Sequence, residues 1–240
     1  MKEKENNLQI LLPVRIAMFA VIFSGASICM NKSLAELSSW WSIIASAVNI
    51  ITIFLIVLVA KNSGLTYWKV INYEKGKTNA SQIIVMTLII LGVGIAGMYL
   101  AGLICYQKIP YAPSVMIAPV PVIFAVVNLL VLPVTTAFAE DGLYLGCGVN
   151  QIQNKAVAII VPGILFALQH SFIPLLIDSL FMLYRFLSFL PLTILLCWNY
   201  HKNRNPLPIM IGHAAIDLMT AAQILATSMI PGFYEMMCGM

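Results

Sequence analysis

Two neighbouring acids, Glu140 and Asp141, lie inside a long apolar stretch that begins near Pro119 and continues beyond them. An acidic side chain near the centre of a membrane helix costs on the order of 2.5–3.5 kcal/mol by insertion scales, so by default it faces a polar cavity. The acids would be interfacial if the helix ended at Phe138, but the apolar residues 143–149 disfavour this alternative. Because neighbours on an α-helix point about 100° apart, we expect one acid to carry the chemistry and the other to support it.

Two histidines in similar apolar surroundings could complete a site with these acids. His170 follows Phe166 by one helical turn in LFALQHSF, and His213 precedes Asp217 by one turn in MIGHAAIDLM. The remaining histidine, His201, lies in a basic loop, where we expect it to be solvated. A lone histidine is usually structural, but two histidines and three acids in apolar helices favour a common polar site.

Such a site could hydrolyse a peptide bond. A glutamate beside an imidazole can act as a general base on water, and a second imidazole with a polar neighbour can stabilise the oxyanion of a tetrahedral intermediate. Glu140, His170 and His213 could instead bind zinc and leave one position open for water. The spacing leaves both alternatives open, since no HExxH is present. A serine mechanism through Ser171 is weaker, because Ser171 adjoins His170 and neighbours on a helix diverge.

The whole chain has the composition of a membrane protein. Only 9% of its residues are charged and its mean hydropathy is +0.94, whereas roughly a quarter of the residues in soluble domains are charged. We therefore predict an all-α, polytopic integral membrane protein with seven to eight transmembrane helices and a buried intramembrane site. The predicted spans are 11–30, 40–60, 82–106, 119–147, 157–170, 174–198 and 207–229. The sixth contains Pro191 and could instead be a re-entrant piece followed by a shorter helix, which would give eight.

Basic residues indicate the orientation of these spans. They gather at the amino terminus, in the loop 61–81 and after Tyr200, whereas the opposite side has only Lys32 and Lys108. The positive-inside bias predicts that the amino terminus and both loops are cytoplasmic, so the net charge of +4 is a topology signal and predicts no nucleic-acid partner.

The first span follows basic residues as a signal peptide does, but Arg15 interrupts it and favours a retained helix.

Two other patterns are interpreted as structural. The five cysteines are scattered without a CxxC and resemble small apolar residues. The sequence GVGIAG at 92–97 matches the dinucleotide fingerprint GxGxxG, but it lies within a span and lacks a strand before it. We predict that these glycines, like Gly142 and Gly146, let a neighbouring helix approach closely.

The polar residues resemble the motifs of a known family, the CPBP intramembrane proteases, also called the Abi family. This family includes CAAX prenyl endopeptidases and bacterial proteins of bacteriocin processing and self-immunity. Its motifs Glu-Glu-x-x-x-Arg, Phe-x-x-x-His and His-x-x-x-Asn/Asp correspond here to 140–145, 166–170 and 213–217. Asp141 stands at the second Glu and Leu145 at the Arg, so a fixed cation is missing.

The resemblance implies a division of labour among these residues. Glu140 would activate water with help from His170, while His213 and Asp217 would form the oxyanion site; Asp141 and Phe166 would have supporting roles. It also implies a single transmembrane domain (1–240) with amino-terminal helices (1–117) and a CPBP-like catalytic core (118–229).

The resemblance further implies a bacterial cell membrane, a membrane-associated or prenylated CAAX-type substrate within the lipid bilayer, and no cofactor. Two alternatives stay open: a catalytically silent homologue that acts as a scaffold or regulator, and a proton-coupled transporter. We also hypothesise that Arg185, which lies in an apolar stretch, either replaces the missing Arg or pairs with Asp178. Local pairing or snorkelling to the membrane interface is the alternative.

Overall fold

The computed structural model describes residues 8–239, which form helices and no strands. Seven of these helices are long and apolar enough to cross a membrane. They are α2 (Leu11–Met30), α4 (Trp41–Asn62), α6 (Ala80–Tyr106), α7 (Val122–Thr136) continued by the π-helix η3 (Ala137–Val149), α8 (Lys155–Gln169) continued by the 3-10 helix η4 (His170–Phe172), α9 (Ser179–Asn203) and α10 (Leu207–Met229). The predicted all-α membrane architecture is confirmed.

The alternative with an eighth span is wrong. Residues 179–203 form one helix that continues through Pro191. Its start is fixed by Asp178, whose side chain accepts hydrogen bonds from the backbone N–H groups of Leu180 and Phe181. A proline removes one backbone donor, and such interruptions are tolerated in membrane helices that pack against neighbours.

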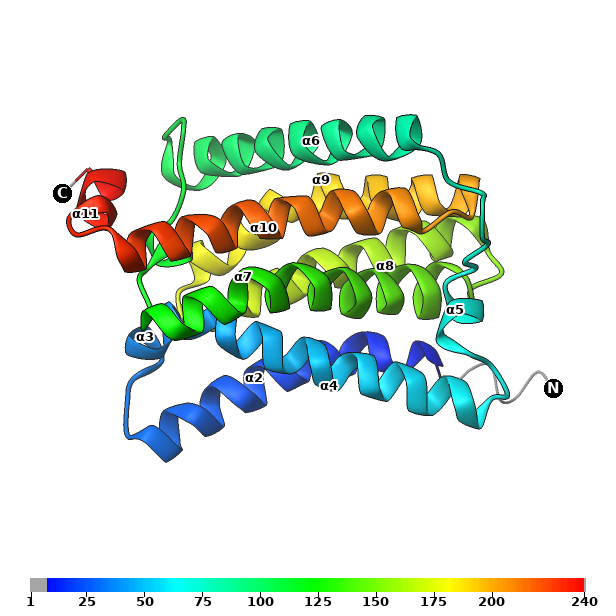
Figure 1. The fold of residues 1–240 in the computed structure, drawn as a ribbon, viewed down its shortest axis with the longest axis horizontal. Helices are drawn as coiled ribbons and strands as arrows, with labels where there is room; N and C mark the ends of the chain where they lie inside the picture. Colours follow the sequence, from blue (N-terminus) through cyan, green and yellow to red (C-terminus); the bar gives the residue numbers. More distant parts are fainter. Residues whose placement is uncertain (1–7, 240) are drawn as a thin grey trace.

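The helices form an antiparallel bundle (Figure 1). Its two ends differ in charge. One end carries α5 (Tyr67–Val70), and the other carries α3 (Leu34–Leu37) and α11 (Phe233–Cys238). By chain order, the α5 end holds most of the basic residues in the described part of the chain: Lys61, Lys69, Lys75, Lys77, Lys155, Lys202 and Arg204. Of the basic residues in the loops of residues 8–239, the other end has Lys32 and Lys108. This asymmetry is consistent with the predicted orientation, although Lys2 and Lys4 lie outside the described residues.

The GxGxxG sequence is part of α6 and serves helix packing. A side chain at Gly97 would collide with the backbone carbonyl of Ser188 on α9, so these two helices touch closely at this glycine. Gly92, at the start of the same sequence, has open space around it. The predicted packing role is thus confirmed, and Gly97 carries it.

The segment that contains both acids is a π-helix, which we did not predict. Its i→i+5 hydrogen bonds make a wider turn than those of an α-helix, so successive side chains diverge by less than 100°. The hydroxyl of Tyr67 on α5 donates to the carbonyl of Phe138 at 2.7 Å, and burial raises the pKa of this phenol, which stays a neutral donor. Gly142 lies against the Tyr67 ring, and Gly146 against α5, so α5 packs directly on the π-helix.

Candidate active site

Glu140 lies in the interior of the bundle, and its carboxylate pairs with an arginine from the first span. The side chain of Arg15 on α2 is 0% exposed and Glu140 is 4% exposed. Arg15 Nη2 donates to Glu140 Oε1 at 2.9 Å. The nearest fixed cation to the acid therefore comes from a helix far from it in sequence.

Three further side chains hold the guanidinium of Arg15. Its Nε donates to Gln169 Oε1 at 2.6 Å, its Nη1 to Thr52 Oγ1 at 2.7 Å, and its Nη2 also to Asn49 Oδ1 at 2.6 Å. A buried charge is costly unless it is paired and hydrogen-bonded, and here both conditions are met. Arg15 thus joins α2, α4, α8 and η3 in one polar network.

The other oxygen of Glu140, Oε2, faces two imidazoles. It lies 3.9 Å from His170 Nε2 and 3.8 Å from His213 Nε2, and it has no hydrogen-bond partner among the described residues. These separations exceed direct hydrogen-bond length and suit groups that share one bridging water. Oε2 and the two Nε2 atoms therefore outline a place where a water molecule would touch all three.

The partners of the Nδ1 atoms fix how each ring presents its Nε2 atom. His170 Nδ1 lies 2.8 Å from the carbonyl of Phe166, which can only accept, so Nδ1 carries a proton and a neutral ring presents an accepting Nε2. His213 Nδ1 lies 3.2 and 3.3 Å from the two carboxylate oxygens of Asp141, so it also donates. The ring of His170 is stacked on Phe189 with centroids 3.6 Å apart, which holds its orientation.

Asp217 closes the cluster from α10. Its Oδ2 lies 4.0 Å from His213 Nε2 and has no hydrogen-bond partner in the described part of the chain. Phe166 stacks on Tyr144 with centroids 4.5 Å apart and lies 5.9 Å from both the His170 and the His213 ring. The structure therefore brings together all the candidate residues that we named: Glu140, Asp141, Phe166, His170, His213 and Asp217.

Sequence reasoning missed the polar residues of α2 and α4. We interpreted Arg15 only as an argument for a retained helix, although a charged residue inside a membrane span is itself a functional signal. Asn49 and Thr52 are three residues apart, so they share one face of α4, and both are buried. A buried arginine followed by a second helix with a polar face is the pattern that could have indicated this network.

The hypothesis for Arg185 is wrong. Among the described residues Arg185 forms no ion pair, and Asp178 caps the start of α9 instead. Arg185 Nε donates to the carbonyls of Ile173 at 3.1 Å and His170 at 3.4 Å, and its guanidinium lies over the Phe189 ring. Two backbone carbonyls at the break between α8 and α9 therefore satisfy this cation locally.

The side chains of residues 8–239 include no group of three or more His, Cys, Asp or Glu arranged to hold a metal ion. The ion pair with Arg15 also offsets the negative charge of Glu140. Zinc at Glu140, His170 and His213 stays an alternative that a chelator must test.

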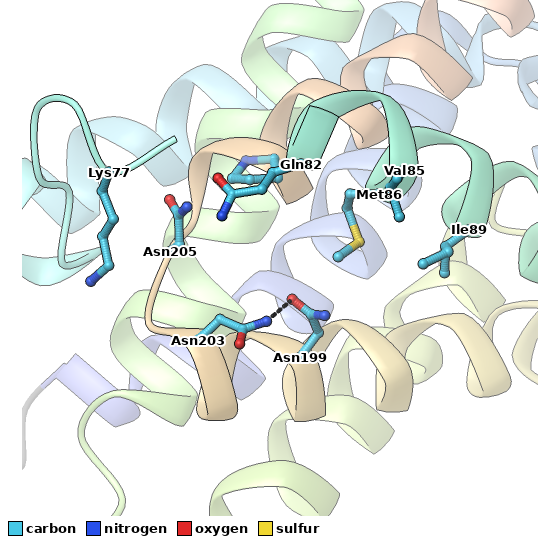
Figure 2. A pocket seen from close by; sticks show the side chains of 9 residues that line it. Lys77, Gln82, Val85, Met86, Ile89, Asn199, Asn203 and Asn205 are labelled. Carbon is cyan, nitrogen blue, oxygen red and sulfur yellow. Dashed lines mark hydrogen bonds between the residues drawn. The ribbon is translucent and has the colours of Figure 1, made fainter. Parts of the chain in front are cut away.

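A cavity of about 350 Å³ lies apart from the acid–histidine cluster (Figure 2). It opens between the start of α6, the end of α9 and the start of α10, near Lys77. None of the cluster residues lines it. It is therefore not a route that touches Glu140 directly.

Part of the chain matches the model of a known protein family. Residues 122–219 match the family model described as type II CAAX prenyl endopeptidase Rce1-like. The matched segment contains all six candidate residues, which confirms the resemblance, whereas Arg15, Asn49 and Thr52 lie outside it. No curated protein and no solved structure matches the chain.

Proposed function

We propose, from the match of residues 122–219 to the type II CAAX prenyl endopeptidase Rce1-like family model, that this chain is an intramembrane endopeptidase. It hydrolyses a peptide bond of a membrane-associated, CAAX-type substrate with water activated by Glu140. The observation that carries the proposal is Glu140 Oε2, a buried acceptor without a partner among the described residues, placed between two Nε2 atoms.

The first chemical step is the attack of water on the scissile carbonyl. A water between these groups donates one proton to Glu140 Oε2 and the other to the accepting Nε2 of His170, which leaves a lone pair directed away from both. As the new C–O bond forms, Glu140 takes the proton from water. His170 orients the water and needs no change of protonation.

His213 stabilises the oxyanion that results. With Nδ1 bonded to Asp141, a second proton on Nε2 makes an imidazolium that the Asp141 carboxylate stabilises. Its Nε2–H then donates to the developing negative charge on the substrate oxygen. Asp217, next to the same nitrogen, can donate only in its protonated form, because a carboxylate offers no proton.

Collapse of the intermediate completes the reaction. The C–N bond breaks, the carbonyl re-forms, and the proton held by Glu140 passes to the leaving amine. Glu140 returns to the carboxylate, so the cycle needs no covalent intermediate and no cofactor. We propose 118–229 as the catalytic core, within a bacterial cell membrane and with the amino terminus cytoplasmic.

The catalytically silent alternative rested on the missing cation at Leu145. Arg15 supplies a cation to Glu140 from α2, so the absence of arginine at position 145 does not argue against activity. No feature of the described residues favours a scaffold or a transporter over hydrolysis.

Cleavage of defined peptides tests the proposal. Purified protein in lipid vesicles is offered a CAAX-type peptide with and without a prenyl group, in the presence and absence of a chelator. We expect cleavage by the wild type, insensitive to the chelator, and a fall of at least about 10²–10⁴-fold in Glu140→Gln, which keeps the size of the side chain but removes the base. Equal rates for the wild type and Glu140→Gln would reject the mechanism, and no cleavage of any peptide would support the silent alternative.

A further inference from the structure

We propose that Arg15 is the positioning residue of the site, and that α2 supplies the cation that the Glu140 helix lacks. Arg15 holds Glu140 as a carboxylate and fixes Oε1, so that Oε2 is the oxygen directed at the histidines. The effect of Arg15 on turnover rests on the proposed function. Its effect on the charge and orientation of Glu140 does not.

The charge balance of the cluster supports this role. Glu140, Asp141 and Asp217 gather around His213, and Arg15 is the only arginine or lysine paired with any of these acids in the described part of the chain. Carboxylates that share a low-dielectric site repel one another, so an unpaired Glu140 would take up a proton and lose its ability to act as a base. A paired cation prevents this.

Neither position 145 nor Arg185 supplies this cation. Leu145 is fully buried in a hydrophobic cluster, and Arg185 is engaged by backbone carbonyls. Arg15, by contrast, donates to Glu140 while three neutral side chains fix the rest of its guanidinium. Neutral partners satisfy its donors without competing for its charge, which is left to Glu140.

The geometry of the network also selects one carboxylate oxygen. Asn49 and Glu140 share Nη2 of Arg15, and Asn49 Nδ2 in turn donates to Thr136 Oγ1 at 2.9 Å, directly before the π-helix. α4 therefore ties the guanidinium to the helix that carries Glu140. We infer that α2 and α4, which lie outside the matched segment, complete the active site.

Infrared spectroscopy tests the charge of Glu140 without any substrate. Ionised and protonated carboxyl groups absorb at separate frequencies, and subtraction of a spectrum of the same background with Glu140→Gln isolates this side chain. We expect a carboxylate signal in the wild type and in Arg15→Lys, and a protonated carboxyl signal in Arg15→Met. Arg185→Met is the control, since it removes another buried arginine that forms no hydrogen bond or ion pair with Glu140, and there the carboxylate signal should stay.

Turnover measures the catalytic consequence. In Arg15→Met we expect kcat to fall by about 10²-fold or more with little change in KM, because the base is lost and substrate contacts are not. Arg15→Lys should recover part of kcat, since it restores the charge but not the four hydrogen bonds. Thr52→Val keeps the cation and removes one acceptor, and should lower kcat by about tenfold.

The outcomes separate this inference from the proposed function. A carboxylate signal that persists in Arg15→Met, or one lost equally in Arg185→Met, would overturn the role of Arg15. If Arg15→Met does not fold, an unchanged kcat in Thr52→Val would overturn it. Absence of cleavage by the wild type would reject the proposed function, while the infrared result would still decide whether Arg15 controls the charge of Glu140.

Discussion

At the scale of single residues, the three acids of the cluster have different partners. Glu140 pairs with Arg15, and Asp141 bonds His213 Nδ1. Asp217 Oδ2 lies 4.0 Å from His213 Nε2 and has no hydrogen-bond partner among the described residues. Our expectation that one of the two neighbouring acids plays a supporting role agrees with these contacts. Asp141 nevertheless reaches the same cluster as Glu140. Our expectation assumed the angle of about 100° between neighbouring side chains of an α-helix, and this angle is smaller in a π-helix.

Asp141 and Asp217 should therefore respond oppositely to the loss of charge. Asp141→Asn removes the carboxylate that stabilises the His213 imidazolium, and we expect kcat to fall by about 10²-fold or more. Asp217→Asn introduces an amide N–H beside His213 Nε2, which can donate to the oxyanion, so activity should be retained or rise. Steady-state kinetics of the two variants on one peptide checks this contrast, and a larger loss in Asp217→Asn than in Asp141→Asn would contradict it.

At the scale of elements, close helix contacts place the catalytic groups. α9 packs on α6 at Gly97 and on α8, the helix that ends at His170. α10, which carries His213, packs on α6 and α7. The position of the site residues thus depends on how tightly α6 fits against α9 and α10.

Two glycines of the same GxGxxG sequence give a matched test of this packing. Gly97→Ala places a methyl group against the backbone carbonyl of Ser188 and should destabilise the protein by about 1–3 kcal/mol. Gly92→Ala meets open space and should stabilise α6 by about 0.5–1 kcal/mol, since alanine has the higher helix propensity. Unfolding in detergent micelles measures both, and equal effects would show that packing at Gly97 is not what limits stability.

At the scale of the whole molecule, the distribution of basic residues predicts the orientation in the membrane. The α5 end should face the cytoplasm, because cytoplasmic loops carry an excess of lysine and arginine. In a cysteine-free variant, Lys75→Cys should react with a membrane-impermeant thiol reagent only from the cytoplasmic side, and Lys108→Cys only from the outside. The reverse labelling pattern would invert the proposed topology without affecting the fold.

Much of the fold could be predicted from the sequence, because the membrane imposes a simple rule. Every backbone polar group must be bonded within its own segment, so length and hydropathy suffice to locate α2 and α10 at the bounds that we predicted. The cost of burying polar side chains likewise indicated Glu140, His170 and His213. The bounds of the remaining helices differ by a few residues, since caps such as Asp178 on α9 move their ends.

Only the tertiary structure decided how the charges of the site are balanced. Hydropathy assigns each residue a cost but does not name its partner, and the residues that bind Arg15 lie 34 to 154 positions away in the chain. The π-helix was also beyond the sequence, because its surroundings come from distant parts of the chain, such as α5, which packs against Gly142 and Gly146 and whose Tyr67 bonds a carbonyl of that helix. Hydropathy and motif spacing therefore determined the spans and the reactive side chains, whereas contacts between distant helices determined which cation pairs with Glu140 and which of its oxygens faces the histidines.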